Sequence, residues 1–405
     1  MKVLLLLTNS FPYGTGESFL SPELNYADGF DKIYVCPCSL SESSEKTRKL
    51  PEGIECIPLH RVTLGKKQYL RLVFRPCILA ECFRLLREKK LTLDRVHELL
   101  FFMKNAQEIS NALKQAVSFH PGDSVVIYSY WLYDAAAAGV LFASILRKNG
   151  VSVRVISRAH GFDIYKERAK DSYLPMRKYL FKNLDHIYPC SVDGESVLKK
   201  EAGKDAAKIT CAYLGTEDYG EGPQKRESFH IVSCSYLVPV KRVHRIIEAL
   251  KQVDYPIIWT HIGSGPLEKE IRQAASQLPK NVKAEFLGTR GNEEILAYYH
   301  SNDISAFVNV SSSEGIPVSI MEAASFGIPV VATDVGGTHE IIENGTNGFL
   351  IPKNFTSQEF LNAIGKIRTM NDDEYHTLCR NARRVWKEKF NAADNFHRFY
   401  GEISK

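Results

Sequence analysis

The feature that most constrains the fold is the regular alternation of short apolar runs with segments of helical character. Val3–Thr8 begins with five consecutive aliphatic residues, the pattern of a strand whose sheet is covered on both faces. The long segment after Tyr133 has helical character and ends at Asn149 and Gly150, a typical stop signal. This alternation predicts an α/β fold with a doubly wound parallel sheet. The strands expected in the first half are VLLLLT, KIYVCPC, SVVIYSYW, VRVISRAHG and HIYPCS.

A polar stretch divides the alternation into two halves. Residues 215–229 are rich in glycine and charge, and we interpret them as a linker. Apolar runs and helical segments then resume and predict a second α/β domain. We therefore expect two Rossmann-like domains, residues 1–215 and 216–385, with ligands bound beyond the carboxyl ends of the strands in a cleft between them. The strands expected in the second half are HIVSCSYL, PIIWTHIG, VKAEFLG, ISAFVNVS, PVVATDV and GFLI.

Composition and charge exclude several classes of protein. The 405 residues are 44% hydrophobic and 24% charged, as in globular chains with a large core. The net charge of +5 is mild and does not indicate a nucleic-acid-binding protein. The nine scattered cysteines contain no C-x-x-C pair and fit a reducing cytosol, so we expect a cytoplasmic protein with free thiols. The first apolar run is too short for a signal peptide, and no run approaches the length of a membrane span.

Residues 60–105 differ in character from the rest of the chain. Lysines and arginines are mixed there with large apolar residues, and acidic residues are fewer. One interpretation is a pair of amphipathic helices with an ordinary solvated face. The other is an interfacial surface for anionic lipid, which would place the protein at the inner face of the cell membrane. The two interpretations are compatible.

The stretch EGIPVSIME, from Glu314 to Glu322, has the features of a ligand site. It follows a predicted strand, so its first carboxylate lies at the carboxyl edge of a sheet. Gly315 allows a ligand to approach the backbone, and Pro317 suits the first turn of a helix. The free amides of that turn, together with the helix dipole, favour a diphosphate. With a carboxylate on either side to accept hydrogen bonds from hydroxyl groups, the stretch predicts a site for a nucleotide diphosphate sugar.

Residues Glu314–Ile351 closely resemble the signature region of the retaining GT-B glycosyltransferases of family 4, whose hallmark is two glutamates separated by seven residues. The resemblance covers nearly the whole chain, and its nearest members are enzymes of bacterial capsule and exopolysaccharide synthesis. It implies that the last helix, within residues 386–405, returns to pack on the first domain. The other matching segments are FPYGTGESFL, SRAHGFDIY, CSYLVPVKRV and HIGSGP.

The resemblance also implies roles for individual residues. His160 resembles the histidine that contacts the transferred sugar, and Glu314 the glutamate beside the hydroxyls of that sugar. Glu322 resembles the ligand of the donor ribose, and Lys241 the cation on the diphosphate leaving group. The further donor-binding positions are Arg242, Gly263, Gly265, Gly315, Ile316, Pro317, Ser319 and Gly16.

One position departs from the family pattern. Family members carry an arginine where this chain has Tyr236, so either Arg242 or another basic group compensates, or backbone amides hold the diphosphate. Tyr236 also has a simpler interpretation as a core residue. For Asp163, a helix N-cap and a functional group are equally good interpretations. Gly336–Gly337 is most simply a turn.

The predicted reaction is transfer of a sugar from a UDP- or GDP-linked donor to a hydroxyl of a saccharide or lipid-linked acceptor, with retention at the anomeric carbon. No cofactor is expected, and no metal, because no DxD-like cluster accompanies the phosphate region. Transition-state stabilisation would be electrostatic. The alternatives are a GT-B nucleotide-sugar epimerase or phosphorylase, and a non-catalytic nucleotide-sugar-binding subunit.

Overall fold

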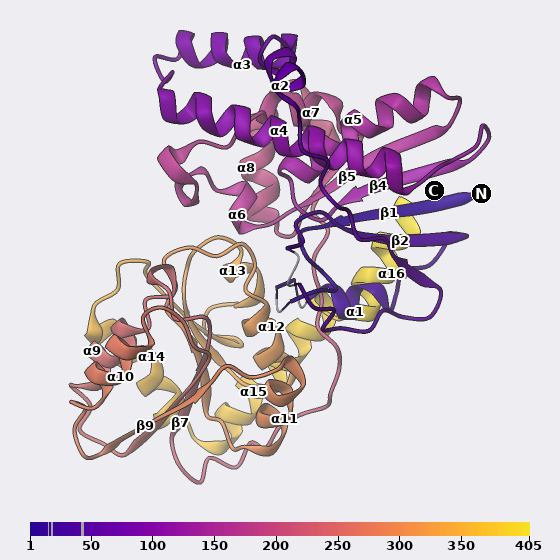
Figure 1. The fold of residues 1–405 in the computed structure, drawn as a ribbon. Helices are drawn as coiled ribbons and strands as arrows, with labels where there is room; N and C mark the ends of the chain where they lie inside the picture. The colour runs from indigo at the N-terminus through magenta and orange to yellow at the C-terminus, as the bar shows by residue number, and fades with distance from the viewer. Residues whose placement is uncertain (15, 18, 42–43) are drawn as a thin grey trace. The chain divides into compact units, whose positions relative to one another are not determined.

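The computed structural model describes residues 1–405 except 15, 18, 42 and 43. The chain divides into two compact units, Met1–Ala212 together with Phe396–Lys405, and Tyr213–Asn395 (Figure 1). The sequence analysis placed the boundary between the two domains at residue 215, and it assigned residues 386–405 to the segment that returns to the first domain. Each unit contains one parallel six-stranded sheet with helices packed against it.

In the first unit the strand order is β3-β2-β1-β4-β5-β6, which reverses direction between β1 and β4. The strands are β1 (Lys2–Thr8), β2 (Lys32–Pro37), β3 (Ile54–Cys56), β4 (Ser124–Ser129), β5 (Ser152–Ala159) and β6 (His186–Pro189). The helices are α1 (Leu20–Leu24), α2 (Lys66–Val73), α3 (Pro76–Arg87), α4 (Leu93–Ala116), α5 (Asp134–Lys148), α6 (Gly161–Ile164), α7 (Arg177–Asn183), α8 (Val192–Ala202) and α16 (Ala392–Ile403), with short 3₁₀ turns at Lys166–Arg168, Lys170–Ser172 and Gly203–Lys208. The expected helix pair of residues 60–105 is wrong, because α2, α3 and the first half of α4 share that range.

The second unit repeats this topology. The strand order of its sheet, β9-β8-β7-β10-β11-β12, is the same as in the first unit, and the order reverses direction between β7 and β10. The strands are β7 (His230–Cys234), β8 (Ile257–Ile262), β9 (Val282–Gly288), β10 (Ala306–Asn309), β11 (Val330–Thr333) and β12 (Gly348–Ile351). The helices are α9 (His244–Leu250), α10 (Glu268–Ala275), α11 (Asn292–Ser301), α12 (Val318–Ser325), α13 (Thr338–Ile341), α14 (Ser357–Thr369) and α15 (Asp372–Lys389), with a 3₁₀ turn at Pro239–Lys241.

The aliphatic run of β1 is buried along its whole apolar length because the sheet is covered on both faces. Leu5 and Leu7 belong to a core that includes residues of α4 and α5. Their neighbours Leu4 and Leu6 point to the opposite face and are also fully buried. This double coverage explains why the run is continuous rather than alternating.

The last helix, α16, packs on the first unit. The ring of Phe399 lies 5.4 Å from that of Tyr128 and 5.2 Å from that of Tyr188. The Tyr188 hydroxyl donates to Glu402 at 2.9 Å. Helix α16 runs from Ala392 to Ile403, within the segment 386–405 expected to return to the first domain, and α15 occupies the chain before it as far as Lys389.

Candidate functional site

The expected site residues lie after the carboxyl ends of the strands, near the point in each sheet where the strand order reverses. In doubly wound sheets this is where ligands bind. In the second unit the relevant loops follow β7, β8 and β10, and in the first unit they follow β1 and β5.

Glu314 follows β10 and is buried in an ion pair. The Lys241 Nζ lies 2.7 Å from Glu314 Oε1, and the Asn309 side-chain amide donates to the same oxygen at 3.3 Å. Burial opposes ionisation of this carboxyl, but the adjacent Lys241 ammonium outweighs burial and lowers the pKa of Glu314. Glu314 is therefore a carboxylate with a cation already beside it.

Glu322 lies within α12 and has a different environment. Its carboxyl is buried, and the Asn292 side-chain amide donates to Oε1 at 2.6 Å. Burial, opposed by this hydrogen bond, raises the pKa of Glu322 to about 7. Asn292 is the first residue of α11, and the sequence did not single it out, because nothing local links it to a carboxylate 30 positions away.

The turn that opens α12 presents free backbone donors between the two carboxylates. Pro317 is the N-cap in an extended conformation, and no side chain caps the helix. The first amides of a helix, here those of Val318 and Ser319, have no acceptor within it. They also lie at the positive end of the helix dipole. The sequence placed Pro317 in the first turn of this helix, and the structure places it one residue earlier, as the N-cap.

The Gly336–Gly337 turn supports the Glu314 loop. The Gly337 amide donates to the Gly315 carbonyl at 2.7 Å. Gly336 has a φ of +52°, and a Cβ there would collide with the carbonyl oxygen of Glu314. Glycine is therefore required for two loops to approach each other, so this turn contributes to the geometry of the site.

Gly263 and Gly265 have a similar structural role. A Cβ on Gly263 would collide with the Ser235 carbonyl, and one on Gly265 would collide with the backbone of Leu237. The Leu237 amide donates to the Ser264 carbonyl at 2.8 Å. These glycines join the loops after β7 and β8, and their expected contact with a nucleotide stays a prediction.

Arg242 and Tyr236 are placed differently. Arg242 donates from Nε to the Val310 carbonyl at 2.8 Å and from Nη2 to the Ser311 carbonyl at 3.0 Å, so it holds the segment that precedes Glu314. Its role toward a diphosphate stays a prediction. The interpretation of Tyr236 as a core residue is wrong, because its side chain is 59% exposed.

In the first unit, His160 lies at the end of β5 within a group of aromatic rings. Its ring stacks on Tyr130 at 4.6 Å and lies 4.8 Å from Trp131 and 6.0 Å from Phe19. Burial, together with the nearby charge of Arg158, lowers the pKa of His160 to about 3. Among the described residues, its buried Nε2 has no hydrogen-bond partner. His160 is a neutral imidazole with one nitrogen available.

Asp163 positions the backbone around His160. Its Oδ1 accepts from the His160 amide at 2.5 Å and its Oδ2 from the Leu132 amide at 2.6 Å. Asp163 is the third residue of α6, so of its two interpretations the helix N-cap is wrong, because His160 occupies that position; the functional interpretation stays a prediction. Burial, opposed by these two amides, raises the pKa of Asp163 to about 7.

Glu17 organises the loop after β1, and the sequence analysis missed it. Its carboxylate accepts from the amides of residues 9, 10 and 11, each at 2.8 Å, and from Trp131 Nε1 at 2.7 Å. A buried glutamate with a φ of +54° has no signature in sequence. Gly16 is exposed, and its carbonyl accepts from Arg48. The phosphate contact expected of Gly16 stays a prediction.

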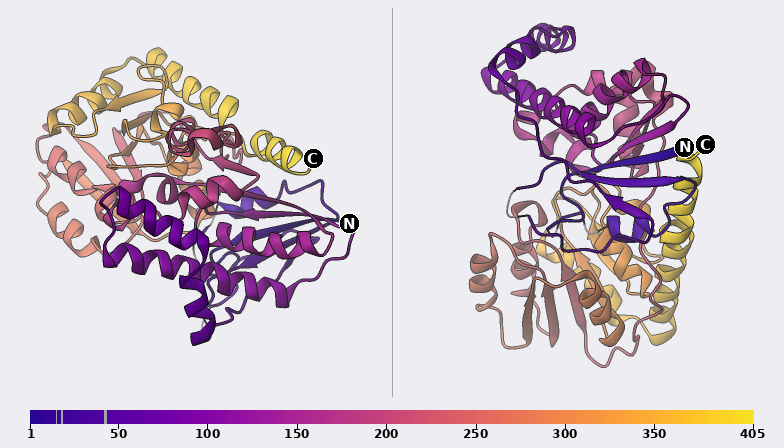
Figure 2. Two further views of the ribbon diagram at one scale, coloured as in Figure 1. Left: turned by 90° about the horizontal axis from the view of Figure 1, so that it is seen from above. Right: turned by 45° about the vertical axis from the view of Figure 1, so that its right-hand side comes forward.

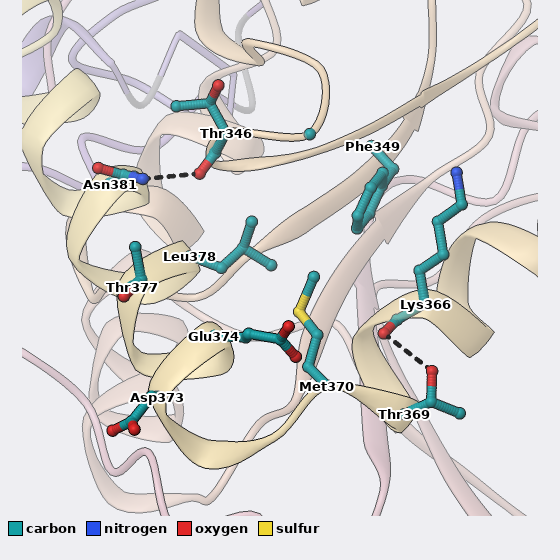
Figure 3. Close-up of a pocket in the computed structure, with 11 residues that line it drawn as sticks. Thr346, Phe349, Lys366, Thr369, Met370, Asp373, Glu374, Thr377, Leu378 and Asn381 are labelled. Atoms are coloured by element: carbon teal, nitrogen blue, oxygen red, sulfur yellow. Dashed lines mark hydrogen bonds between the residues drawn. The ribbon is translucent and has the colours of Figure 1, made fainter.

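A separate hollow of about 640 Å³ lies between α14 and α15 (Figure 3). Polar side chains line much of it, and Asn381 donates to the Thr346 carbonyl at 3.0 Å. None of the expected site residues borders this hollow. In the described part of the chain, the hollow included, no three His, Cys, Asp or Glu side chains lie close enough together to hold a metal ion.

A comparison with known proteins finds a family match within the second unit. Residues 217–385 match the family Glycosyl transferases group 1. This range contains Lys241, Arg242, Glu314 and Glu322, whereas His160 lies outside it. The buried carboxylates and the Lys241 cation therefore belong to the part of the chain that resembles this family in sequence.

Relatives over longer ranges carry related names. The chain is 27% identical over 265 residues to WcaL of Escherichia coli K12, named for colanic acid biosynthesis, with 63% of this chain and 65% of WcaL covered. It is 28% identical over 227 residues to the amylovoran biosynthesis glycosyltransferase AmsK of Erwinia amylovora, with 53% and 56% covered. The match thus spans less than two thirds of each relative.

Solved structures establish the fold of the whole chain. The structure of Anabaena Alr3699/HepE in complex with UDP superposes with a TM-score of 0.69 at 19% identity and covers 100% of both chains. Sucrose-phosphate synthase from Thermosynechococcus elongatus has a TM-score of 0.71 at 16% identity, with 100% and 98% covered. The predicted α/β fold with two Rossmann-like domains of GT-B type is confirmed.

Proposed function

We propose that this protein is a retaining glycosyltransferase that moves a sugar from a nucleotide diphosphate sugar to a hydroxyl of a saccharide or lipid-linked acceptor, without a metal, in the synthesis of a surface polysaccharide. The observation that carries the proposal is the arrangement around α12. Along the chain, a helix N-terminus without a side-chain cap lies between two buried carboxylates, and one of these, Glu314, is paired with Lys241. The family match of residues 217–385 and the names of WcaL and AmsK support it.

The donor would exchange the internal ion pair for interactions with the ligand. A diphosphate at the α12 N-terminus attracts the Lys241 ammonium, which frees Glu314 oxygens to accept from hydroxyls of the transferred sugar. Charge grows on the leaving phosphate as the glycosidic bond breaks. The amides of α12 and Lys241 would stabilise that charge without reorganisation. That Anabaena HepE was crystallised with UDP supports a nucleotide donor.

The two remaining polar groups would act on opposite parts of the donor. Glu322 would accept hydrogen bonds from the ribose hydroxyls. His160, which is neutral with Nε2 available, would exchange a hydrogen bond with the transferred sugar and not provide a charge. We therefore expect Glu322→Ala to weaken donor binding mainly, and His160→Ala to slow turnover mainly.

The test has a binding step and a transfer step. A thermal-shift screen with UDP- and GDP-sugars identifies the donor, because a ligand of the native state raises the melting temperature. The donor is then incubated with and without saccharide acceptors. Transfer with retention supports the proposal, whereas donor consumption without any acceptor would indicate an epimerase. Binding without turnover across an acceptor panel would indicate a non-catalytic subunit.

A further inference from the structure

The exposed surface of α2 and α3 is unusually apolar. In the described part of the chain, nine of the fourteen exposed large hydrophobic side chains fall within residues 69–101. On α3, Leu79, Phe83 and Leu86 are between 51% and 67% exposed and follow the i, i+4, i+7 spacing of one helix face. Leu70 on α2 and Phe74 at its C-cap form a second exposed pair.

This exposure is not a consequence of α3 being poorly packed. Its opposite face buries Ile78 and Leu85 almost completely. The helix therefore has two apolar faces, and only one of them is needed for the fold. Figures 1 and 2 show α3 at the outer edge of the first unit, away from its sheet. Contiguous exposed apolar surface of this kind marks an interaction site.

Charge identifies the kind of partner. Residues 66–90 contain eight lysines and arginines against two glutamates, an excess of six positive charges in a chain whose total is +5. The remainder of the chain thus has a net charge of −1. Both glutamates, Glu81 and Glu88, are already paired with Arg84, at 2.6 Å and 2.9 Å. The basic residues beside the apolar stripe, Lys66, Lys67, Arg87, Lys89 and Lys90, are exposed.

We propose that this α2–α3 surface, residues 66–90, docks on a bilayer that contains anionic lipid. The apolar stripe would enter the boundary between headgroups and acyl chains while the flanking lysines and arginines contact the headgroups. A second copy of the chain is disfavoured as the partner, because two such surfaces facing each other would place like charges together. Every helix in the described residues is too short or too polar to span a bilayer.

The proposal is tested by flotation of the full chain with vesicles of phosphatidylcholine alone and with one part in three phosphatidylglycerol. Neither donor nor acceptor is present, so the result does not depend on the proposed transferase activity. We expect binding to the anionic vesicles only, weakened by salt. The variant Leu79→Ser/Phe83→Ser/Leu86→Ser should lose this binding. Because all three side chains are exposed, its melting temperature should stay near that of the wild type.

A charge variant and a matched control isolate the electrostatic contribution to vesicle binding. The substitutions Lys66→Glu/Lys67→Glu/Arg87→Glu should lower the partition coefficient by about a hundredfold or more, because each of the three lost positive charges contributes about fivefold to binding. The control Lys269→Glu/Lys280→Glu/Lys353→Glu makes the same change in net charge at exposed positions of the second unit, and it should bind like the wild type. Equal binding to neutral vesicles, equal loss in the control, or a dimer in solution that the serine variant dissociates would each overturn the proposal.

Discussion

The buried carboxyl of Glu322 should destabilise the fold that holds it. Among the described residues the only donor to this carboxyl is Asn292, which does not offset burial, and the pKa of Glu322 lies at about 7 rather than at its ordinary value of 4.5. Below about pH 4.5 the group is protonated in both the folded and the unfolded chain, so it costs nothing. As the pH rises from about 4.5 to about 7, the unfolded chain loses this proton while the folded chain still holds it, so the stability of the folded state falls; above about pH 7 the full penalty is present.

The size of this penalty follows from the pKa. Each tenfold change in proton affinity is worth about 1.4 kcal/mol, so ionised Glu322 costs about 3 kcal/mol at pH 8. Glu322→Gln retains an acceptor oxygen for Asn292 but carries no charge. The variant should therefore be more stable than the wild type by about 3 kcal/mol at pH 8, which is roughly 6–12 °C in melting temperature for a unit of this size. At pH 4.5 the gain should vanish.

Tryptophan fluorescence is a suitable probe, because two of the three tryptophans, Trp259 and Trp386, are buried in the second unit with Glu322. Thermal and urea unfolding would be recorded at both pH values. Glu270→Gln, at an exposed position of α10, serves as the control and should change neither transition. Donor affinity should move in the opposite direction and fall about 10–100-fold, since a charge-assisted hydrogen bond is lost. A stability gain of equal size at both pH values, or none at pH 8, would refute the role of ionisation.

Three further outcomes are expected. Lys241→Met removes the cation expected at the leaving phosphate and also leaves Glu314 buried without its partner. Turnover should therefore fall at least a hundredfold, and an unchanged kcat would contradict the role of Lys241 at the leaving group. His160→Ala should lower kcat about tenfold or more. The pH profile of wild-type kcat/KM should show no ionisation of this imidazole between pH 5 and 9, because its pKa is about 3. A descending limb of that profile near pH 6.5 that the variant abolishes would instead show a titrating histidine. Gly336→Ala, at a φ of +52° against the Glu314 carbonyl, should cost about 1–3 kcal/mol in unfolding free energy, and an unperturbed melting curve would contradict the required close approach.

Much of the fold was predictable because its determinants are local. A continuous aliphatic run such as Val3–Thr8 can be satisfied only where both sheet faces are covered, and β1 is buried in this way. The stop signal at Asn149–Gly150 and the proline before α12 mark helix ends by the conformations that these residues permit. The same local logic placed Glu314 after a strand and Glu322 within the helix that follows.

The tertiary structure alone decided how each group at the site is charged. The sequence determined that two carboxylates, a lysine and a histidine follow strands of parallel sheets. It could not determine that Glu314 is paired with Lys241 while Glu322 has only Asn292, or that Glu17 holds three amides of the loop after β1. These partners are distant in sequence or depend on an uncommon backbone conformation. A pKa depends on the burial and the charges that surround a group in space, and the order of residues along a chain does not specify either.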